Sequence, residues 1–311
     1  MTKINHIDPK NSKILFGLNK EINFFINLYN RDKFPKTIML SGNKGIGKFT
    51  LINHLLCYIY NKKNYNLDKK EINKDSNYYM NYLNGTFSDI IYLSGDHFKN
   101  VKIEDIRILK STILKSSFSG LKRFIILDDV ELFNLNSLNA LLKLVEEPVS
   151  NNYFILINNQ TKPLLETVCS RAIEFKIFLE DSNRIKIIET LLNYNNINPF
   201  ISYEIGNLSP GSYLSFNCIC EENNIKLDTN FQKNLKILIN LYKKNKDKNV
   251  INLIMFITDF YFNELSKDRN KQLDKVIDDR SFVVSNINKF LLYNINQNAL
   301  LNAINYRLSN E

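Results

Sequence analysis

Tryptophan is missing from this chain of 311 residues, and histidine is scarce, with three residues. His6, His54 and His97 lie far from one another in the sequence, and none is near another candidate catalytic group. A histidine-based catalytic triad is therefore not expected, because its imidazole must meet both a nucleophile and an orienting partner.

Cysteine is also rare. The four cysteines, Cys57, Cys169, Cys218 and Cys220, follow no disulfide framework spacing, which fits a reducing cytoplasm. Cys218 and Cys220 have a spacing that suggests half of a metal site, yet no further cysteine or histidine lies near them. Small buried side chains are the better interpretation of these residues.

Long apolar runs are missing as well. The most apolar window, residues 250–265, contains Asp259 and is too short to span a membrane. Residues 1–20 carry charges throughout, unlike a signal peptide. We therefore expect a soluble, cytoplasmic, globular protein that has no membrane partner.

Acidic residues are outnumbered by basic ones, 32 to 41, which gives a net charge of +9 and an isoelectric point of about 9.1. A basic protein invites a nucleic-acid partner. However, the lysines are spread along the chain, and Asn, Ile and Lys are heavily used throughout. The charge is therefore weak evidence for contact with DNA.

A glycine-rich segment stands between a short apolar run, residues 38–40, and a helical pattern that starts at Lys48. Gly42, Gly45, Gly47 and Lys48 fit the G-x-x-x-x-G-K pattern of a phosphate-binding loop. In such a loop the backbone N–H groups point into one concavity, and the following helix N-terminus adds partial positive charge. Lys48 would then reach the outer phosphates of ATP or ADP.

The residue after Lys48 breaks this pattern. The position normally carries Ser or Thr, whose hydroxyl holds Mg²⁺, and here it is Phe49. Thr50 follows, but one helical step turns its side chain about 100° away. We keep Thr50 in the predicted nucleotide site, expect weak binding of ATP or ADP, and leave Mg²⁺ binding open.

Apolar strands alternate with helical patterns over residues 1–178, which predicts an α/β domain with a mostly parallel sheet covered on both faces. The expected strands are residues 36–42, 89–93, 123–128, 153–157 and 173–177. We expect strand 36–42 at the centre of the sheet, with 123–128 and 153–157 as its neighbours.

Asp128 and Asp129 follow one of these buried strands, at the edge of the sheet where ligands of such folds bind. In P-loop ATPases the first acid of such a pair orients Mg²⁺ and the second positions the attacking water. The second acid is more often Glu, and Asp129 is one methylene shorter. The pair therefore predicts a nucleotide site in which hydrolysis is in doubt.

The remaining segments carry weaker signals. Residues 62–85 are rich in Asn, Lys, Asp and Tyr and are expected to form a surface insertion. After residue 178 the strand signal ends, and short helices are expected to about residue 226. Residues 227–311 are expected to be all helical.

Two further motifs make the pattern specific. They are Asn139-Ala-Leu-Leu-Lys-Leu-Val-Glu-Glu-Pro148 and Cys169-Ser-Arg171. Together with the phosphate loop and the acidic pair, they resemble the bacterial AAA+ clamp-loader proteins of DNA polymerase III, most of all the delta-prime branch. The motif match covers residues 16–178, and the helical remainder is similar only in length and pattern.

The resemblance implies an AAA+ nucleotide-binding domain at 1–178, a helical lid at 179–226 and a helical collar at 227–311. The collar would assemble a hetero-pentameric ring with motor and delta-like subunits, which uses ATP to open a sliding clamp and place it on primed DNA. Arg171 would act in trans as an arginine finger on the ATP of a neighbour. Delta-prime members often hydrolyse nothing and serve as a rigid stator.

This chain departs from the family pattern in several places. Many relatives carry a four-cysteine zinc module between the phosphate loop and the acidic strand, whereas residues 58–127 contain no cysteine, so we predict no zinc. Some relatives have a phosphate-contacting arginine in the lid, and residues 210–215 contain none. With Phe49 and Asp129, these departures favour a weak or silent nucleotide site.

Three alternatives stay open. The first is an ATP-hydrolysing motor subunit of the same family, against which Phe49 and the missing lid arginine argue. The second is a stand-alone P-loop NTPase such as a nucleotide kinase, whose lid needs arginines, yet Arg184 is the only arginine between Arg171 and Arg269. The third is a DNA-binding scaffold, which only the isoelectric point supports.

Overall fold

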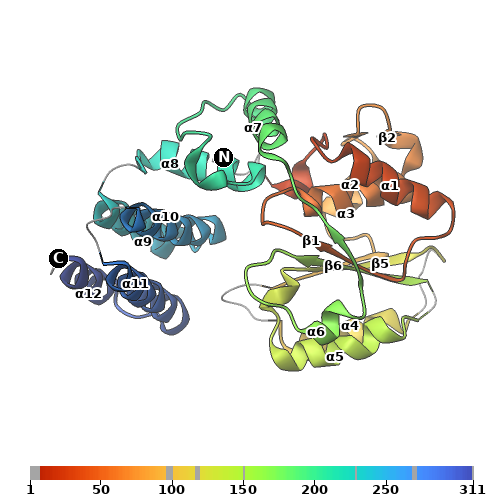
Figure 1. The fold of residues 1–311 in the computed structure, drawn as a ribbon. Coiled ribbons are helices and arrows are strands. Elements are labelled where there is room, and N and C mark those ends of the chain that lie inside the picture. Colours follow the sequence, from red (N-terminus) through yellow and green to blue (C-terminus); the bar gives the residue numbers. More distant parts are fainter. Residues whose placement is uncertain are drawn as a thin grey trace. The chain divides into compact units, whose positions relative to one another are not determined.

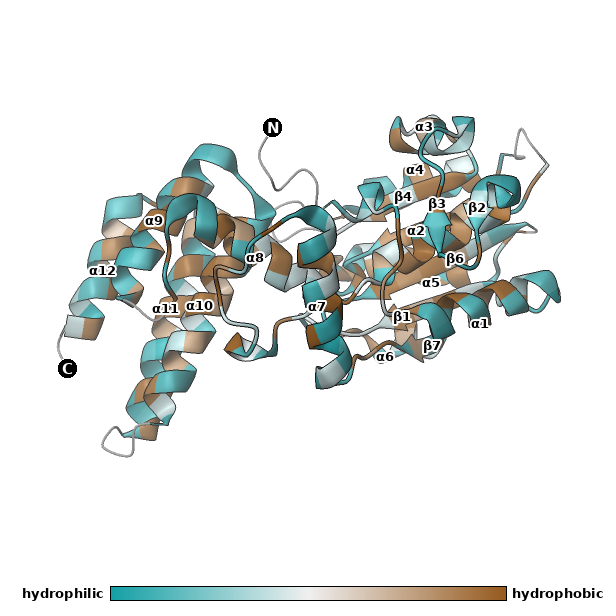
Figure 2. Ribbon diagram, turned by 90° about the horizontal axis from the view of Figure 1, so that it is seen from above, coloured by the Kyte–Doolittle hydropathy of each residue, from teal (hydrophilic) through white to brown (hydrophobic). Residues whose placement is uncertain are grey.

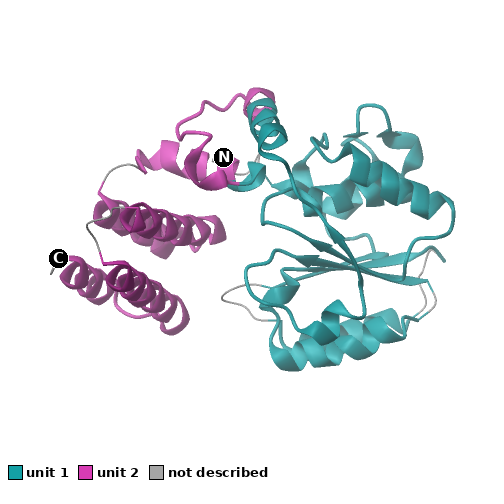
Figure 3. Cartoon of the chain, in the orientation of Figure 1, with its two compact units in different colours: residues 1–191, 209–212 teal, residues 192–208, 213–311 magenta. Residues whose placement is uncertain are grey.

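The computed structural model describes residues 8–95, 101–115, 120–149, 151–227, 230–267 and 272–309. His6 and His97 lie outside these ranges. The chain forms two compact units, of which the first contains residues 1–191 and 209–212 and the second the remainder (Figure 3). Within the described ranges, no helix is both long and apolar enough to cross a membrane.

The first unit is an α/β domain built on a five-stranded sheet in the order β4-β5-β6-β1-β7 (Figure 1). All neighbouring strands run parallel. The strands are β1 (Thr37–Ser41), β4 (Ile90–Ser94), β5 (Arg123–Asp128), β6 (Asn152–Asn158) and β7 (Ile173–Lys176). The predicted parallel sheet is confirmed.

Of the two neighbours predicted for the first strand, β6 is confirmed and β5 is wrong, and the strand is not at the centre of the sheet. β1 lies between β6 and β7, where Ile38 is in register with Ile155 and Ile173. The acidic strand β5 pairs with β6 and β4 and not with β1. Apolar runs mark buried strands but do not set their order, because a crossover helix can carry the chain past a strand.

Helices cover both faces of the sheet (Figure 1). On one face lie α1 (Asn19–Asn30) and α2 (Lys48–Tyr60), and on the other lie α4 (Ile103–Ile113) and α5 (Leu135–Glu146). Figure 2 shows hydrophobic residues along the strands, whereas α1 carries both hydrophobic and hydrophilic residues. Leu135, the first residue of α5, is 59% exposed.

Residues 62–85 form small elements of their own: 3₁₀ helix η3 (Lys62–Asn64), strands β2 (Tyr65–Asn66) and β3 (Glu71–Ile72), and helix α3 (Asn77–Leu83). The description as a surface insertion is only partly correct, because Tyr65, Ile72 and Tyr79 are buried in the core. The Tyr79 hydroxyl donates to the Lys10 carbonyl at 3.0 Å. A tyrosine can bury its ring and still satisfy its hydroxyl, so a tyrosine-rich segment can join a core.

After β7, the described residues contain helices and no further strand. They are α7 (Asp181–Asn195), η5 (Ile205–Asn207), α8 (Pro210–Asn223), α9 (Phe231–Asn245), α10 (Lys248–Ser266), α11 (Leu273–Tyr293) and α12 (Gln297–Ser309). Shorter elements in the first unit are η2 (Pro9–Asn11), η4 (Val130–Leu132) and α6 (Glu166–Cys169). The expected helical character of the C-terminal region is confirmed, while its division into lid and collar stays a prediction.

Candidate functional site

The glycine-rich loop joins β1 to α2, as the sequence predicts. Gly45 and Gly47 have φ angles of 81° and 103°, a region that side chains with a Cβ rarely adopt. The Gly42 N–H donates to the Asn158 carbonyl at 3.2 Å, which ties the start of the loop to the end of β6. The loop therefore leads into the N-terminus of α2, the part of a helix that attracts anions.

Lys48, the first residue of α2, is only 3% exposed. Its Nζ donates to the carbonyl oxygens of Gly42 at 2.5 Å and Asn43 at 2.9 Å. Burial lowers the pKa of Lys48 to about 8, although the carboxylates of Asp128 and its neighbours oppose this shift. The ammonium group thus remains mostly charged at neutral pH and lies against its own loop.

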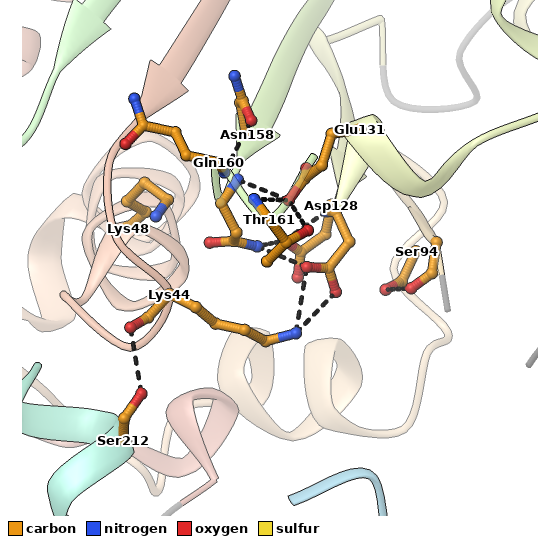
Figure 4. Close-up of polar contacts among 12 residues, drawn as sticks. Lys44, Lys48, Ser94, Asp128, Glu131, Asn158, Gln160, Thr161 and Ser212 are labelled. Atoms are coloured by element: carbon orange, nitrogen blue, oxygen red, sulfur yellow. Dashed lines mark hydrogen bonds and ion pairs between the residues drawn. The ribbon is translucent and has the colours of Figure 1, made fainter. Parts of the chain in front are cut away.

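Asp128 and Asp129 lie at the end of β5, which is separated from β1 by β6 in the sheet. Asp129 nevertheless contacts the glycine-rich loop. Asp129 has a left-handed φ of 51°, and its carboxylate accepts from Lys44 Nζ at 3.2 Å and from Asn159 Nδ2 at 2.7 Å (Figure 4). Asp128 accepts the hydroxyl of Tyr92 at 2.8 Å. Burial, followed by the charge of Asp129, raises the pKa of Asp128.

Phe49 fills the place where a metal-binding hydroxyl would stand. Its ring packs edge-on against Tyr92, with ring centroids 5.2 Å apart, and Tyr92 in turn occupies one oxygen of Asp128. Burial and the Asp128 carboxylate raise the pKa of Tyr92, so its phenol stays protonated and keeps donating. In the described part of the chain, Thr50 makes no side-chain hydrogen bond that would replace the missing hydroxyl.

The residues present do not fit a Mg²⁺ site of the usual P-loop kind, because phenylalanine offers no oxygen and Asp128 is bonded to a phenol. The ranges described above contain no group of three or more His, Cys, Asp or Glu residues arranged to hold a metal ion. None of the four cysteines, all of which lie in the described ranges, forms a disulfide. The prediction that zinc is not bound stays a prediction.

Four polar residues outside the predicted site, Lys44, Glu131, Asn159 and Thr161, complete this cluster. Glu131 is buried, and its Oε1 accepts from the backbone N–H of Asn159 at 3.1 Å and from the Thr161 hydroxyl at 2.8 Å. Lys44 reaches Asp129 from inside the loop (Figure 4). The signal that could have found them is position, since all follow the carboxyl ends of β1, β5 and β6.

The segment that opens α8 holds the other side of the loop. The hydroxyls of Ser209 and Ser212 donate to the Lys44 carbonyl at 2.5 and 3.2 Å, and the Gly211 N–H donates to the Gly45 carbonyl at 2.8 Å. Gly211 and Ser212 belong to residues 210–215, which contain no arginine. Neutral donors therefore contact the loop carbonyls there.

Arg171 lies apart from this cluster, two residues beyond the end of α6. Its Nη2 forms an ion pair with Glu146 Oε1 at 2.9 Å, and its Nη1 donates to the Thr167 carbonyl at 2.9 Å. The structure thus joins the two motifs that end in Pro148 and Arg171. The predicted site residues divide into two places: the loop and acidic pair in one, and Arg171 in the other.

A phosphate-type loop after a parallel strand, with an acidic strand beyond the next strand and helices on both faces, defines the AAA+ P-loop class of α/β domains. The family model described as "DNA polymerase III, delta subunit" matches residues 17–180. This chain belongs to that family.

Curated relatives carry related names. DNA polymerase III subunit delta' of Buchnera aphidicola subsp. Baizongia pistaciae is 27% identical over 231 residues, which span 69% of this chain and 68% of the relative. DNA polymerase III subunit delta' of Pseudomonas aeruginosa is 31% identical over 91 residues, 29% of this chain and 28% of that protein. DNA polymerase III subunit tau of Escherichia coli is 31% identical over 114 residues, 36% of this chain and 17% of the relative.

Among solved structures, a DNA polymerase III gamma subunit-related protein from Thermotoga maritima aligns with 90% of this chain and 96% of its own. The sequence identity is 16% and the TM-score is 0.46.

Proposed function

We propose that this chain is a delta-prime-type stator of a DNA polymerase III clamp loader. In this role it supports ATP-dependent loading of a sliding clamp on primed DNA, and its own nucleotide site does not drive hydrolysis. Its partners are the motor and delta-like subunits of a hetero-pentameric ring. A replication role would also place the protein in the cytoplasm.

The observation that carries the stator role is the contact of Phe49 with Tyr92. In P-loop proteins that hydrolyse ATP, the hydroxyl of the residue after the loop lysine and the acid at the end of the strand together hold Mg²⁺. In this chain Phe49 occupies that residue position and packs against Tyr92, and the Tyr92 hydroxyl donates to Asp128 at 2.8 Å. Phosphate contacts by Gly45, Gly47 and Lys48 remain compatible with weak binding of ATP or ADP.

Arg171 is the residue we propose to act on a neighbour's ATP. A guanidinium presents a planar fork to the γ-phosphate and stabilises charge as the bond breaks. The Arg171 side chain is 30% exposed, which leaves part of the guanidinium open to an adjacent subunit. Family membership and the Ser-Arg motif support this role.

The C-terminal helices provide the proposed assembly region. We propose residues 179–226 as a helical lid and residues 227–311 as the collar that joins the ring. Apolar residues exposed on α11 and α12 support this, since large exposed apolar groups often mark interfaces. They are Leu273, Ile277, Leu292, Tyr293 and Tyr306.

An ATP-hydrolysing motor subunit is the second candidate, because the three loop glycines, Lys48 and the acidic pair are all present. Purified chain should settle the choice through its steady-state ATPase activity, which we expect to be negligible. Steady turnover that Lys48→Ala abolishes would favour the motor role. Family membership weighs against a stand-alone P-loop enzyme.

Reconstitution of the whole loader tests the stator role. We expect Arg171→Ala to leave assembly intact and to lower clamp- and DNA-stimulated ATP hydrolysis. Arginine fingers of GTPases are worth about 10³–10⁵ in rate, and we expect a smaller loss, about tenfold, because the ring holds several sites. Arg171→Lys should rescue poorly, since an ammonium lacks the fork. Unchanged turnover with alanine at this position would contradict the proposal.

A further inference from the structure

We propose that Glu146 is the positioning residue for Arg171. The inference rests on the proposed function, in which Arg171 acts on the ATP of a neighbouring subunit. Glu146 would not touch that nucleotide. It would hold the guanidinium in the orientation from which the arginine reaches across the subunit boundary.

Two contacts hold the Arg171 side chain, one at each terminal nitrogen of the guanidinium group. Glu146 Oε1 bonds Nη2 at 2.9 Å, and the Thr167 carbonyl accepts from Nη1 at 2.9 Å. The Nε atom is buried and makes no hydrogen bond to the described residues. The first contact comes from another helix and the second from the preceding turn of the same segment, so the plane of the guanidinium is defined by both.

The position of Glu146 in the fold makes it a suitable anchor. It is the last residue of α5, whose buried Leu141, Leu144 and Val145 pack into the core under the sheet. Its backbone is therefore fixed by the domain, while its side chain is 53% exposed. A carboxylate on a rigid helix end restricts a long, flexible arginine that an open surface would leave free.

The Arg171–Glu146 ion pair is strong enough to orient the arginine but too weak to prevent it from leaving Glu146. Exposed ion pairs favour their bound geometry by about fivefold at most. That preference narrows the arginine rotamers yet is small enough for the several charges of a triphosphate to overcome. A fully buried pair would oppose release much more strongly.

Glu147 offers a matched control. It is the next residue, it is acidic and exposed, and it caps the same helix end. The ion pairs of the described residues include none for Glu147. A change of charge at this end of α5 can thus be separated from loss of the contact with Arg171.

The test is a reconstituted loader that carries Glu146→Gln, Glu147→Gln, Arg171→Ala or the Glu146→Gln/Arg171→Ala pair. Thermal melting and co-elution with partner subunits check folding and assembly for each. We expect Glu146→Gln to lower kcat for clamp- and DNA-stimulated ATP hydrolysis by about two- to threefold, within the bound for an exposed pair. Glu147→Gln should match the wild type, and Glu146→Gln should cause no further loss in the Arg171→Ala background.

The outcomes separate the two proposals. If Arg171→Ala itself leaves turnover unchanged, the proposed function fails and this inference fails with it. If Arg171→Ala lowers turnover while Glu146→Gln equals the wild type or raises turnover, only the positioning role is overturned. Additive losses in the double variant would also overturn it, because Glu146 would then act independently of Arg171.

Discussion

The buried His54 should make the stability of the α/β domain strongly dependent on pH. His54 lies in α2, the helix that follows the phosphate loop, and is fully buried. Its Nδ1 lies 3.2 Å from the Tyr65 hydroxyl. Burial lowers the pKa of His54 to about 3.

The sign follows from proton binding. In the unfolded chain a histidine has a pKa of about 6.5, so below that pH the unfolded state binds a proton that the folded state does not. Stability is then lost as the pH falls from about 6.5 towards 3, by up to about 1.4 kcal/mol per pH unit. Between pH 7 and pH 5 this amounts to about 2 kcal/mol, a large part of a typical domain stability of about 5–15 kcal/mol.

Urea unfolding at pH 7, 6 and 5 measures this effect. We expect His54→Gln, which cannot titrate, to lose about 2 kcal/mol less than the wild type over that range. Tyr65→Phe keeps the buried imidazole and should retain most of the wild-type slope. The comparison uses slopes, so it holds even where a variant is less stable at pH 7. Parallel curves for the wild type and His54→Gln would refute the assignment of a neutral, buried imidazole.

Three other substitutions test the site and its surroundings. Phe49→Ser alone should not create Mg²⁺-dependent binding of a fluorescent ATP analogue, whereas the Phe49→Ser/Tyr92→Phe double variant should, because the second change frees the carboxylate of Asp128. Equal affinities with and without Mg²⁺ in the double variant would count against this. Gly45→Ala should lower the free energy of unfolding by more than the ~1 kcal/mol of a left-handed residue alone, since a Cβ there would lie 2.5 Å from Ser209 Oγ; a urea midpoint equal to the wild type would contradict it. Tyr60→Phe should lower the free energy of unfolding by about 1–3 kcal/mol, because the Tyr60 hydroxyl donates to the backbone carbonyls of Lys122 and Asp89, at 2.5 and 3.1 Å. Unchanged stability in the same assay would argue against those hydrogen bonds.

The sequence alone located the strands of the sheet and the glycine-rich loop between β1 and α2. Short apolar runs located the five strands of the sheet, and period-3.6 apolar patterns located the longer helices between them, since burial selects residue type directly. Gly42, Gly45, Gly47 and Lys48 were found from spacing, because a loop that cradles phosphate needs those residue types in that order. The break at Phe49 was equally visible from a single position.

Tertiary structure decided what residues distant in the chain do together. The strand order, with β6 between β1 and β5, depends on crossovers that no local pattern records. Tyr92, on β4, meets Phe49 and Asp128 only because the strands align their carboxyl ends. Lys44 and Asn159 on Asp129 are likewise contacts between loops of different strands.

The same distinction applies to Arg171. Its motif could be read from the sequence, but its partner Glu146 lies 25 residues earlier and belongs to another helix. Sequence periodicity reports which side chains are buried and which backbone positions need glycine. Pairing between half-exposed polar groups follows from the packing of whole elements, so only the folded domain decides it.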